Sequence, residues 1–139
     1  MGAVLFALDQ EFIALDKLSR ELLAKLPDEQ LFVKPREISM FSCGEYLVRS
    51  AAMVEKTFDG ITTRLWDDPF EWTLPEKLGD RSGVLQYLDE VEATRVKAFG
   101  SFASDDDLNR NIPAPEQLRP LISVLVETLS HVVAKARSL

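Results

Sequence analysis

The sequence has little of what several functional classes require. It contains 1 cysteine among 139 residues, so no disulfide can form within one chain. Its 16 basic residues are outnumbered by 23 acidic ones, which argues against nucleic acid as a partner. No apolar run reaches the roughly 18 residues that a membrane-spanning helix needs, so we expect no contact with a membrane. The first residues lack the basic region of a signal peptide, and the length fits one domain over residues 1–139, so we expect a single-domain cytoplasmic protein.

The apolar residues that are present recur every three or four positions, as on one face of a helix. This spacing predicts helices over residues 3–26, 42–64, 80–99 and 120–138. Ser42 and Glu45 form the Ser-x-x-Glu pattern of a helix start, and Pro120 suits the first turn of the last helix. No segment has the alternating pattern of a strand. The sequence therefore predicts an all-α protein with a four-helix bundle fold.

The last predicted helix combines an apolar surface over most of its circumference with the single histidine. Such a helix is expected to be buried on more than one side. Glu127 and His131 are four residues apart and share one face of it. A pair of this kind is either half of a site for zinc or another divalent ion, or a histidine hydrogen-bonded to a glutamate one turn earlier.

Four segments resemble the DinB-like proteins, and together they cover nearly the whole chain in the order of that family. They are LPDEQL (26–31), FSCGEYLVRSAAMVE (41–55), YLDEV (87–91) and LVETLSH (125–131). The resemblance implies a four-helix bundle with up-down-down-up topology that is often dimeric. Many such proteins hold a divalent metal, such as zinc or nickel, on one histidine of the second helix and two of the fourth. Some are thiol-dependent transferases or isomerases.

The three histidine positions of that family fall on Arg49, Glu127 and His131, so this chain keeps one histidine of the three. Arginine stays protonated and offers no lone pair, so Arg49 cannot bind a metal ion. The resemblance therefore implies that the metal site is lost and that no cofactor is bound. We expect a polar pocket of Arg49, Glu127 and His131, in which Arg49 forms an ion pair with Glu127.

Three other features allow two interpretations each. Cys43, at the start of the second predicted helix, is either an activated thiol or a small buried residue. Residues 105–107 are all aspartate, and they form either a calcium loop or a solvated loop; the spacing of ligands in an EF-hand is absent, which favours the solvated loop. Trp66, Phe70 and Trp72 either rim an apolar pocket or form a packed lid over the bundle.

These features support one preferred function and two alternatives. The preferred function is a dimeric, non-enzymatic protein that is associated with stress or binds a small anion or thiol at Arg49, Glu127 and His131. The first alternative is an enzyme, a metal-dependent or thiol-dependent transferase or hydrolase, that uses Glu127 and has His131 as its candidate catalytic residue. The second is a structural module in which the apolar last helix pairs two subunits.

Overall fold

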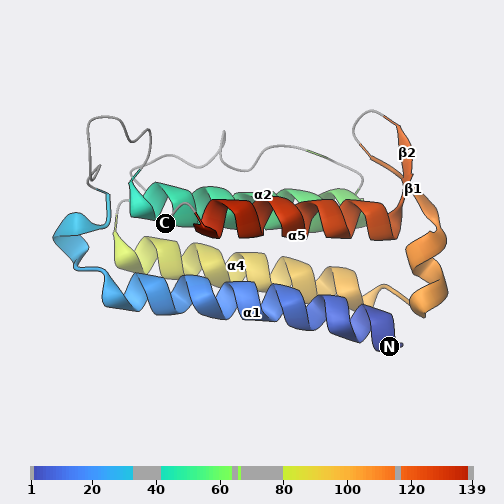
Figure 1. The fold of residues 1–139 in the computed structure, drawn as a ribbon, viewed down its shortest axis with the longest axis horizontal. Helices are drawn as coiled ribbons and strands as arrows, with labels where there is room; N and C mark the ends of the chain where they lie inside the picture. Colours follow the sequence, from blue (N-terminus) through green and yellow to red (C-terminus); the bar gives the residue numbers. More distant parts are fainter. Residues whose placement is uncertain (1, 33–41, 64–65, 67–79, 115–116, 138–139) are drawn as a thin grey trace.

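Four α-helices make up most of the described part of the protein, as the sequence predicted. The structure is a computed structural model that describes residues 2–32, 42–63, 66, 80–114 and 117–137. Its α-helices are α1 (Ala3–Lys25), α2 (Cys43–Thr63), α4 (Arg81–Gly100) and α5 (Leu121–Arg137). They lie side by side as a bundle (Figure 1), so the all-α, four-helix prediction is confirmed. Among the described residues, no helix has both the length and the apolar composition needed to cross a bilayer.

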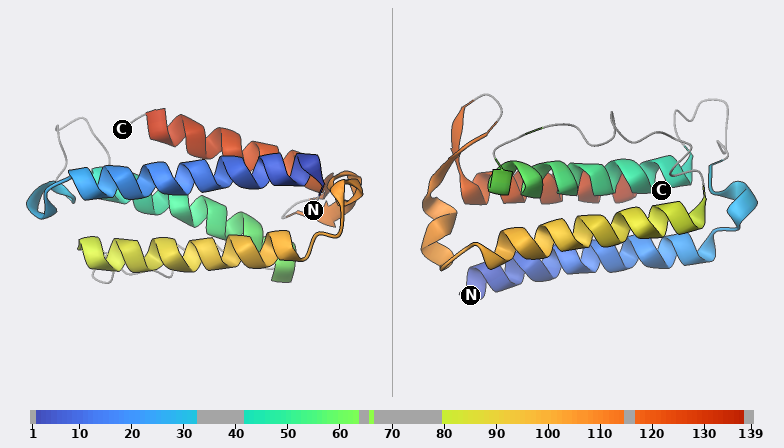
Figure 2. Two further views of the ribbon diagram at one scale, coloured as in Figure 1. Left: turned by 90° about the horizontal axis from the view of Figure 1, so that it is seen from below. Right: turned by 180° about the vertical axis from the view of Figure 1, so that it is seen from behind.

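The four helices run along the bundle in two directions. Figure 1 shows α1 and α5 running from right to left and α2 and α4 running from left to right. The views in Figure 2 agree with these directions. The end of α2 and the start of α4 consequently lie at opposite ends of the bundle.

A short β-hairpin precedes α5, and here the prediction of a strand-free chain was wrong. Strand β1 (Asn111–Pro113) pairs in antiparallel fashion with β2 (Leu118–Pro120), with Asn111 opposite Pro120. Strands of three residues are too short to show an alternating pattern, so no periodicity predicts them. Pro120 is the last residue of β2 and not part of α5, a strand-end position that proline tolerates because no ladder hydrogen bond is needed from it.

The helix starts are fixed by side chains that accept backbone hydrogen bonds. The Ser42 hydroxyl accepts from the Glu45 backbone N–H at 3.2 Å, as the Ser-x-x-Glu pattern predicted. The Asp80 carboxylate accepts from Gly83 N–H at 2.7 Å, so Asp80 caps α4. Each of these bonds satisfies a backbone donor that has no partner within the helix.

The aspartate run at residues 105–107 lies at the surface, as predicted, but it forms a 3-10 helix with a structural role and not a loop. Asp105 begins the short 3-10 helix η2 (Asp105–Asn109), and its carboxylate accepts from Val4 N–H at 3.1 Å and from Leu5 N–H at 2.9 Å. Asp107 accepts from Ala103 N–H at 2.6 Å within its own turn. Backbone hydrogen bonds therefore lower the pKa of Asp107. The run caps two helices, one of them more than a hundred residues earlier in the chain.

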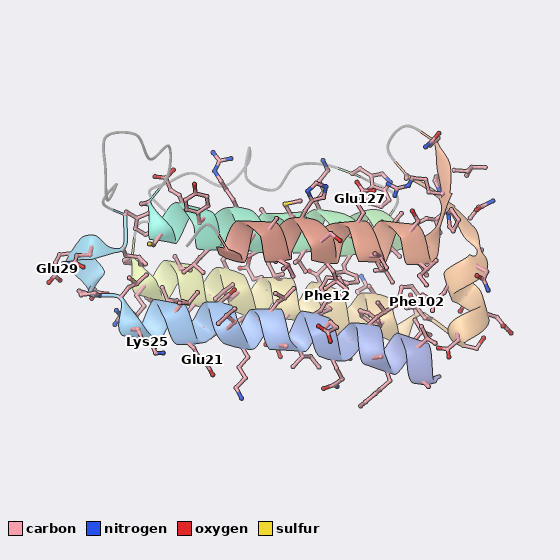
Figure 3. All side chains as sticks on the ribbon, in the orientation of Figure 1. Phe12, Glu21, Lys25, Glu29, Phe102 and Glu127 are labelled. Carbon is pink, nitrogen blue, oxygen red and sulfur yellow. The ribbon has the colours of Figure 1, made fainter. Side chains whose placement is uncertain are left out.

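The core lies between the four helices and is built around aromatic rings. Phe12, Phe58 and Phe99, from three different helices, have ring centroids 4.9 to 6.2 Å apart, and Phe102 lies 5.4 Å from Phe99. Figure 3 labels Phe12 and Phe102 on the inner side of the bundle. Edge-to-face rings at these distances add to the stabilisation that comes from burial alone. This core fixes the helices that carry the candidate site.

Helix α5 is buried along one face only in the single chain, whereas its apolar surface predicted burial on more than one side. Its buried positions follow a spacing of three or four: Leu121, Val124, Leu125, Thr128 and Val132. On the other side, the side chain of Val126 is 47% exposed. The exposed side of α5 therefore has both polar and apolar residues available to partners.

Candidate functional site

Glu127 and His131 lie on the exposed side of α5. Their side chains are 51% and 58% exposed, and His131 Nε2 lies 3.9 Å from Glu127 Oε1. The predicted sharing of a helix face is therefore confirmed, but the contact between the two groups is loose. Figure 3 shows Glu127 on the side of α5 that points away from α1 and α4.

Glu127 has a closer partner in Arg119. The Arg119 guanidinium donates through Nη2 to Glu127 Oε2 and also, at 2.8 Å, to Ser123 Oγ. Arg119 belongs to β2, and its side chain is 25% exposed. Arg119, Ser123, Glu127 and His131 follow one another at intervals of four residues, and we call these four residues the α5 polar row.

The sequence predicted Arg49 as the partner of Glu127, and the structure gives Arg119 in that role. Arg49 lies on α2 and is partly buried. Arg119 directly precedes Pro120, where the helical pattern was expected to start, so the predicted helix did not include it. The missed signal was the spacing of four that continues from Glu127 through Ser123 back to Arg119.

The α5 polar row does not fit a divalent metal ion. One oxygen of Glu127 already accepts from the Arg119 guanidinium, whose fixed positive charge would repel a second cation. A protein zinc site uses at least three protein ligands. Within the described part of the chain, no three His, Cys, Asp or Glu side chains lie close enough together to hold a metal ion.

A second candidate site lies inside the bundle, on the side where α1 and α4 meet. It is a cavity of about 30 Å³ with residues from all four helices around it. Its walls are mainly apolar and include Phe12, Ala51, Val54, Leu88, Val91 and Val132. Ser50 is also in the wall, and Asp16 and Glu92 lie where the cavity approaches the surface.

A network of charged side chains joins α1 to α4 beside this cavity. Arg20 forms ion pairs with Asp16 at 2.9 Å, with Asp89 at 2.8 Å and with Glu92 at 3.2 Å. Burial opposes the charge of Arg20, but the hydrogen bonds to Asp16 and Asp89 outweigh that effect, so the pKa of Arg20 is raised.

Arg95 of α4 and Asp9 of α1 form a second ion pair between these two helices. Their side chains are 6% and 18% exposed, so this pair is largely withdrawn from water. Removing one partner of such a pair leaves the other charge buried and uncompensated, which is strongly destabilising. Ion pairs therefore hold α1 against α4 in addition to apolar packing.

Glu55 and Tyr87 form a titratable pair between α2 and α4 that the sequence did not reveal. The Tyr87 hydroxyl donates to Glu55 Oε2 at 2.5 Å. Burial raises the pKa of Glu55, and the nearby Asp59 and Glu90 act in the same direction, while the Tyr87 hydrogen bond opposes them.

The remaining residues that the sequence indicated are partly buried or lie outside the described part of the chain. Trp66 packs against the core, and its indole N–H donates to the Pro113 carbonyl oxygen at 2.9 Å, which agrees with the predicted packed lid. Phe70 and Trp72 lie outside the described residues. Cys43 is the first residue of α2 and is a partly buried free thiol.

No protein-family model, no curated protein and no solved structure matches this chain. What the protein does is therefore inferred from its own residues and from how the fold places them.

Proposed function

We propose that this chain is a DinB-like four-helix bundle that has lost the metal site of that family and serves as a metal-independent, dimeric small-molecule-binding protein. The observation that carries the proposal is the contact between Arg119 and Glu127. Glu127 stands where the family has a metal-binding histidine, and its carboxylate accepts a hydrogen bond from the Arg119 guanidinium. The helix directions in Figure 1 support the up-down-down-up topology, since α2 and α4 run opposite to α1 and α5.

The exposure of Glu127 and His131 favours binding over catalysis. Both side chains are more than half exposed, at 51% and 58%. An active site strengthens electrostatic interactions by excluding water and holding its polar groups in fixed positions. Among the described residues, none encloses the α5 polar row and none supplies a third metal ligand to it. A transferase or hydrolase based on Glu127 and His131 is therefore the less favoured function.

A second copy of the chain is the partner that the exposed side of α5 fits best. A shallow groove of about 370 Å³ runs along it, lined by Val126, Leu129, Ser130, Val133 and Ala134. If two α5 helices pack antiparallel around a two-fold axis at Ser130, Val126 lies opposite the partner's Ala134. A large residue then meets a small one twice, which suits an isologous interface.

Metal analysis tests the loss of the metal site. Purified protein is dialysed, loaded in parallel with zinc, nickel or manganese, dialysed again and analysed by plasma mass spectrometry. We expect wild-type protein to retain far less than one ion per chain, because Arg119 holds Glu127. The variant Arg119→Ala also frees Glu127 Oε2 and should retain more zinc than wild type.

The control for this experiment is His131→Ala in both backgrounds. Near-stoichiometric metal in wild-type protein that disappears in His131→Ala would overturn the proposal. The working function would then be a metal-dependent enzyme centred on Glu127 and His131.

A further inference from the structure

The cavity inside the bundle has features of a binding site that is separate from the α5 polar row. Its walls come from α1, α2, α4 and α5, and its volume is about 30 Å³. A volume of roughly 10–15 Å³ on this scale is enough for one water molecule. The cavity therefore has room for a group of two or three heavy atoms, and a longer molecule could extend out through the opening.

Ser50 provides a polar group inside this cavity. Its side chain is 8% exposed and lies in the cavity wall. The structure shows no hydrogen bond from this hydroxyl to another described residue, whereas the neighbouring Ser19 hydroxyl donates to the Leu15 carbonyl at 3.0 Å. Buried hydroxyls are normally paired, so Ser50 is available to a polar group that enters the cavity.

The opening of the cavity carries an excess of negative charge. Asp16, Glu92 and Arg95 lie in its lining. Their ion-pair network adds Arg20, Asp89 and Asp9, so four carboxylates accompany two arginines on this side of the bundle. A local excess of carboxylates attracts a small cation and disfavours an anion. Between this opening and Ser50, the wall is apolar, with Phe12, Val54 and Leu88.

We propose that the cavity binds a small amino alcohol with a free hydroxyl. The ligand hydroxyl pairs with Ser50, its methylene groups contact Phe12, Val54 and Leu88, and its ammonium group stays at the opening beside Asp16 and Glu92. The ammonium group thus keeps part of its hydration while it interacts with carboxylates. The inference rests on the proposed binding role and specifies its ligand class.

The probe for this site is 2-aminoethanol, titrated into full-length, isotopically labelled protein and followed by amide chemical shifts in NMR spectra. We expect saturable shifts around Ser19, Ser50 and Val91 at concentrations up to about 100 mM. Ethylamine lacks the hydroxyl and should bind about fivefold more weakly, the factor expected for one hydrogen bond. Ethylene glycol lacks the charge, and phosphoethanolamine has its hydroxyl esterified, so both should bind more weakly still.

The variant Ser50→Ala removes the hydroxyl and leaves the cavity open. In this variant, we expect 2-aminoethanol to bind no better than ethylamine, because the ligand hydroxyl has lost its partner. Ser50→Val fills the cavity and should abolish binding of both amines. Ser82→Ala, at an exposed serine in the first turn of α4, is the matched control and should bind both amines as wild type does.

Two results would overturn the inference: the absence of saturable shifts with wild-type protein, or a preference for 2-aminoethanol that survives in Ser50→Ala. The amide spectra of each variant also show whether it is folded. Protein that holds no metal and ignores 2-aminoethanol would refute this inference alone. Stoichiometric metal on His131 would refute the proposed function, whatever the cavity binds.

Discussion

Two threonines hydrogen-bond to each other inside the bundle, between α2 and α5. Thr57 Oγ1 and Thr128 Oγ1 lie 2.7 Å apart, and the Thr128 hydroxyl also donates to the Val124 carbonyl at 3.0 Å. Each hydroxyl has one hydrogen to donate, so Thr57 must be the donor to Thr128. The two threonines are therefore not equivalent, although they are 8% and 6% exposed.

Replacing these threonines one at a time should give unequal losses of stability. Thr128→Val leaves the Thr57 hydroxyl buried without its acceptor and should lower the free energy of unfolding by about 1–3 kcal/mol. Thr57→Val leaves Thr128 bonded to Val124 and should cost less, about 1 kcal/mol or below. Urea unfolding of both variants and of the double variant measures the difference. Equal losses in the two single variants would contradict the assigned direction of the bond.

Glu55 should make the stability of the protein depend on pH in a defined direction. Burial raises its pKa above the ordinary value of 4.5, so the folded state binds the proton more tightly than the unfolded state does. Its contribution to stability is fully present below 4.5 and is lost as the pH rises through the folded pKa. Glutamine resembles the protonated carboxyl and does not lose its proton.

The variant Glu55→Gln should therefore gain stability relative to wild type as the pH rises from 4 towards 8. Urea unfolding at a series of pH values gives the difference between the two proteins. Tyr87→Phe is the companion variant, because removing the hydroxyl hydrogen bond should raise the pKa of Glu55 further. A stability difference between Glu55→Gln and wild type that stays constant with pH would show that Glu55 does not titrate in this range.

At the scale of the elements, α1 depends on a cap that comes from η2. Gly2 at the N-cap position contributes no side-chain hydrogen bond, and the Asp105 carboxylate takes that role for Val4 and Leu5. A Cβ atom on Gly2 would lie 2.4 Å from the carboxylate carbon of Asp105, so a larger residue there would displace the cap. The negative charge also suits the positive end of the helix dipole.

Removing this cap should destabilise the fold by the amount typical of an N-cap residue. Asp105→Ala is expected to lower the free energy of unfolding by about 1–2 kcal/mol, since two backbone donors of α1 lose their acceptor. Asp106→Ala, at the exposed neighbouring position, is the control and should stay within about 0.5 kcal/mol of wild type. A loss in Asp106→Ala as large as that in Asp105→Ala would mean that the charge of the run matters and the cap does not.

The helices could be predicted from the sequence, whereas the contacts between elements could not. The four helices were predictable because each has its own apolar period, and α1 was expected over residues 3–26 and is observed over Ala3–Lys25. The Asp105 cap and the β-hairpin were missed because they depend on partners from other parts of the chain. The candidate site was half predictable: the spacing placed Glu127 and His131 on one face, but it could not identify Arg119 as the arginine on Glu127.

At the scale of the whole molecule, repulsion between the net charges of two chains opposes the apolar contact between their α5 helices in the proposed dimer. Each chain has a formal net charge of −7, so two copies repel one another at low ionic strength. At 0.1 M salt, the repulsion between charges more than roughly 10 Å apart is largely screened, whereas apolar contacts stay intact. Dimerisation through α5 should therefore strengthen as the salt concentration rises, which light scattering coupled to size-exclusion chromatography can measure.

The variant Val126→Glu tests where the two copies meet. Val126 is 47% exposed in the groove on α5, and a glutamate there would place a charge in the apolar contact of both subunits. We expect Val126→Glu to be a monomer under conditions in which wild-type protein is a dimer. Val96→Glu is the matched control, because Val96 is 57% exposed on α4 and lies outside the groove. A dimer that tolerates Val126→Glu but dissociates in Val96→Glu would move the interface to α4 and leave α5 free for other partners.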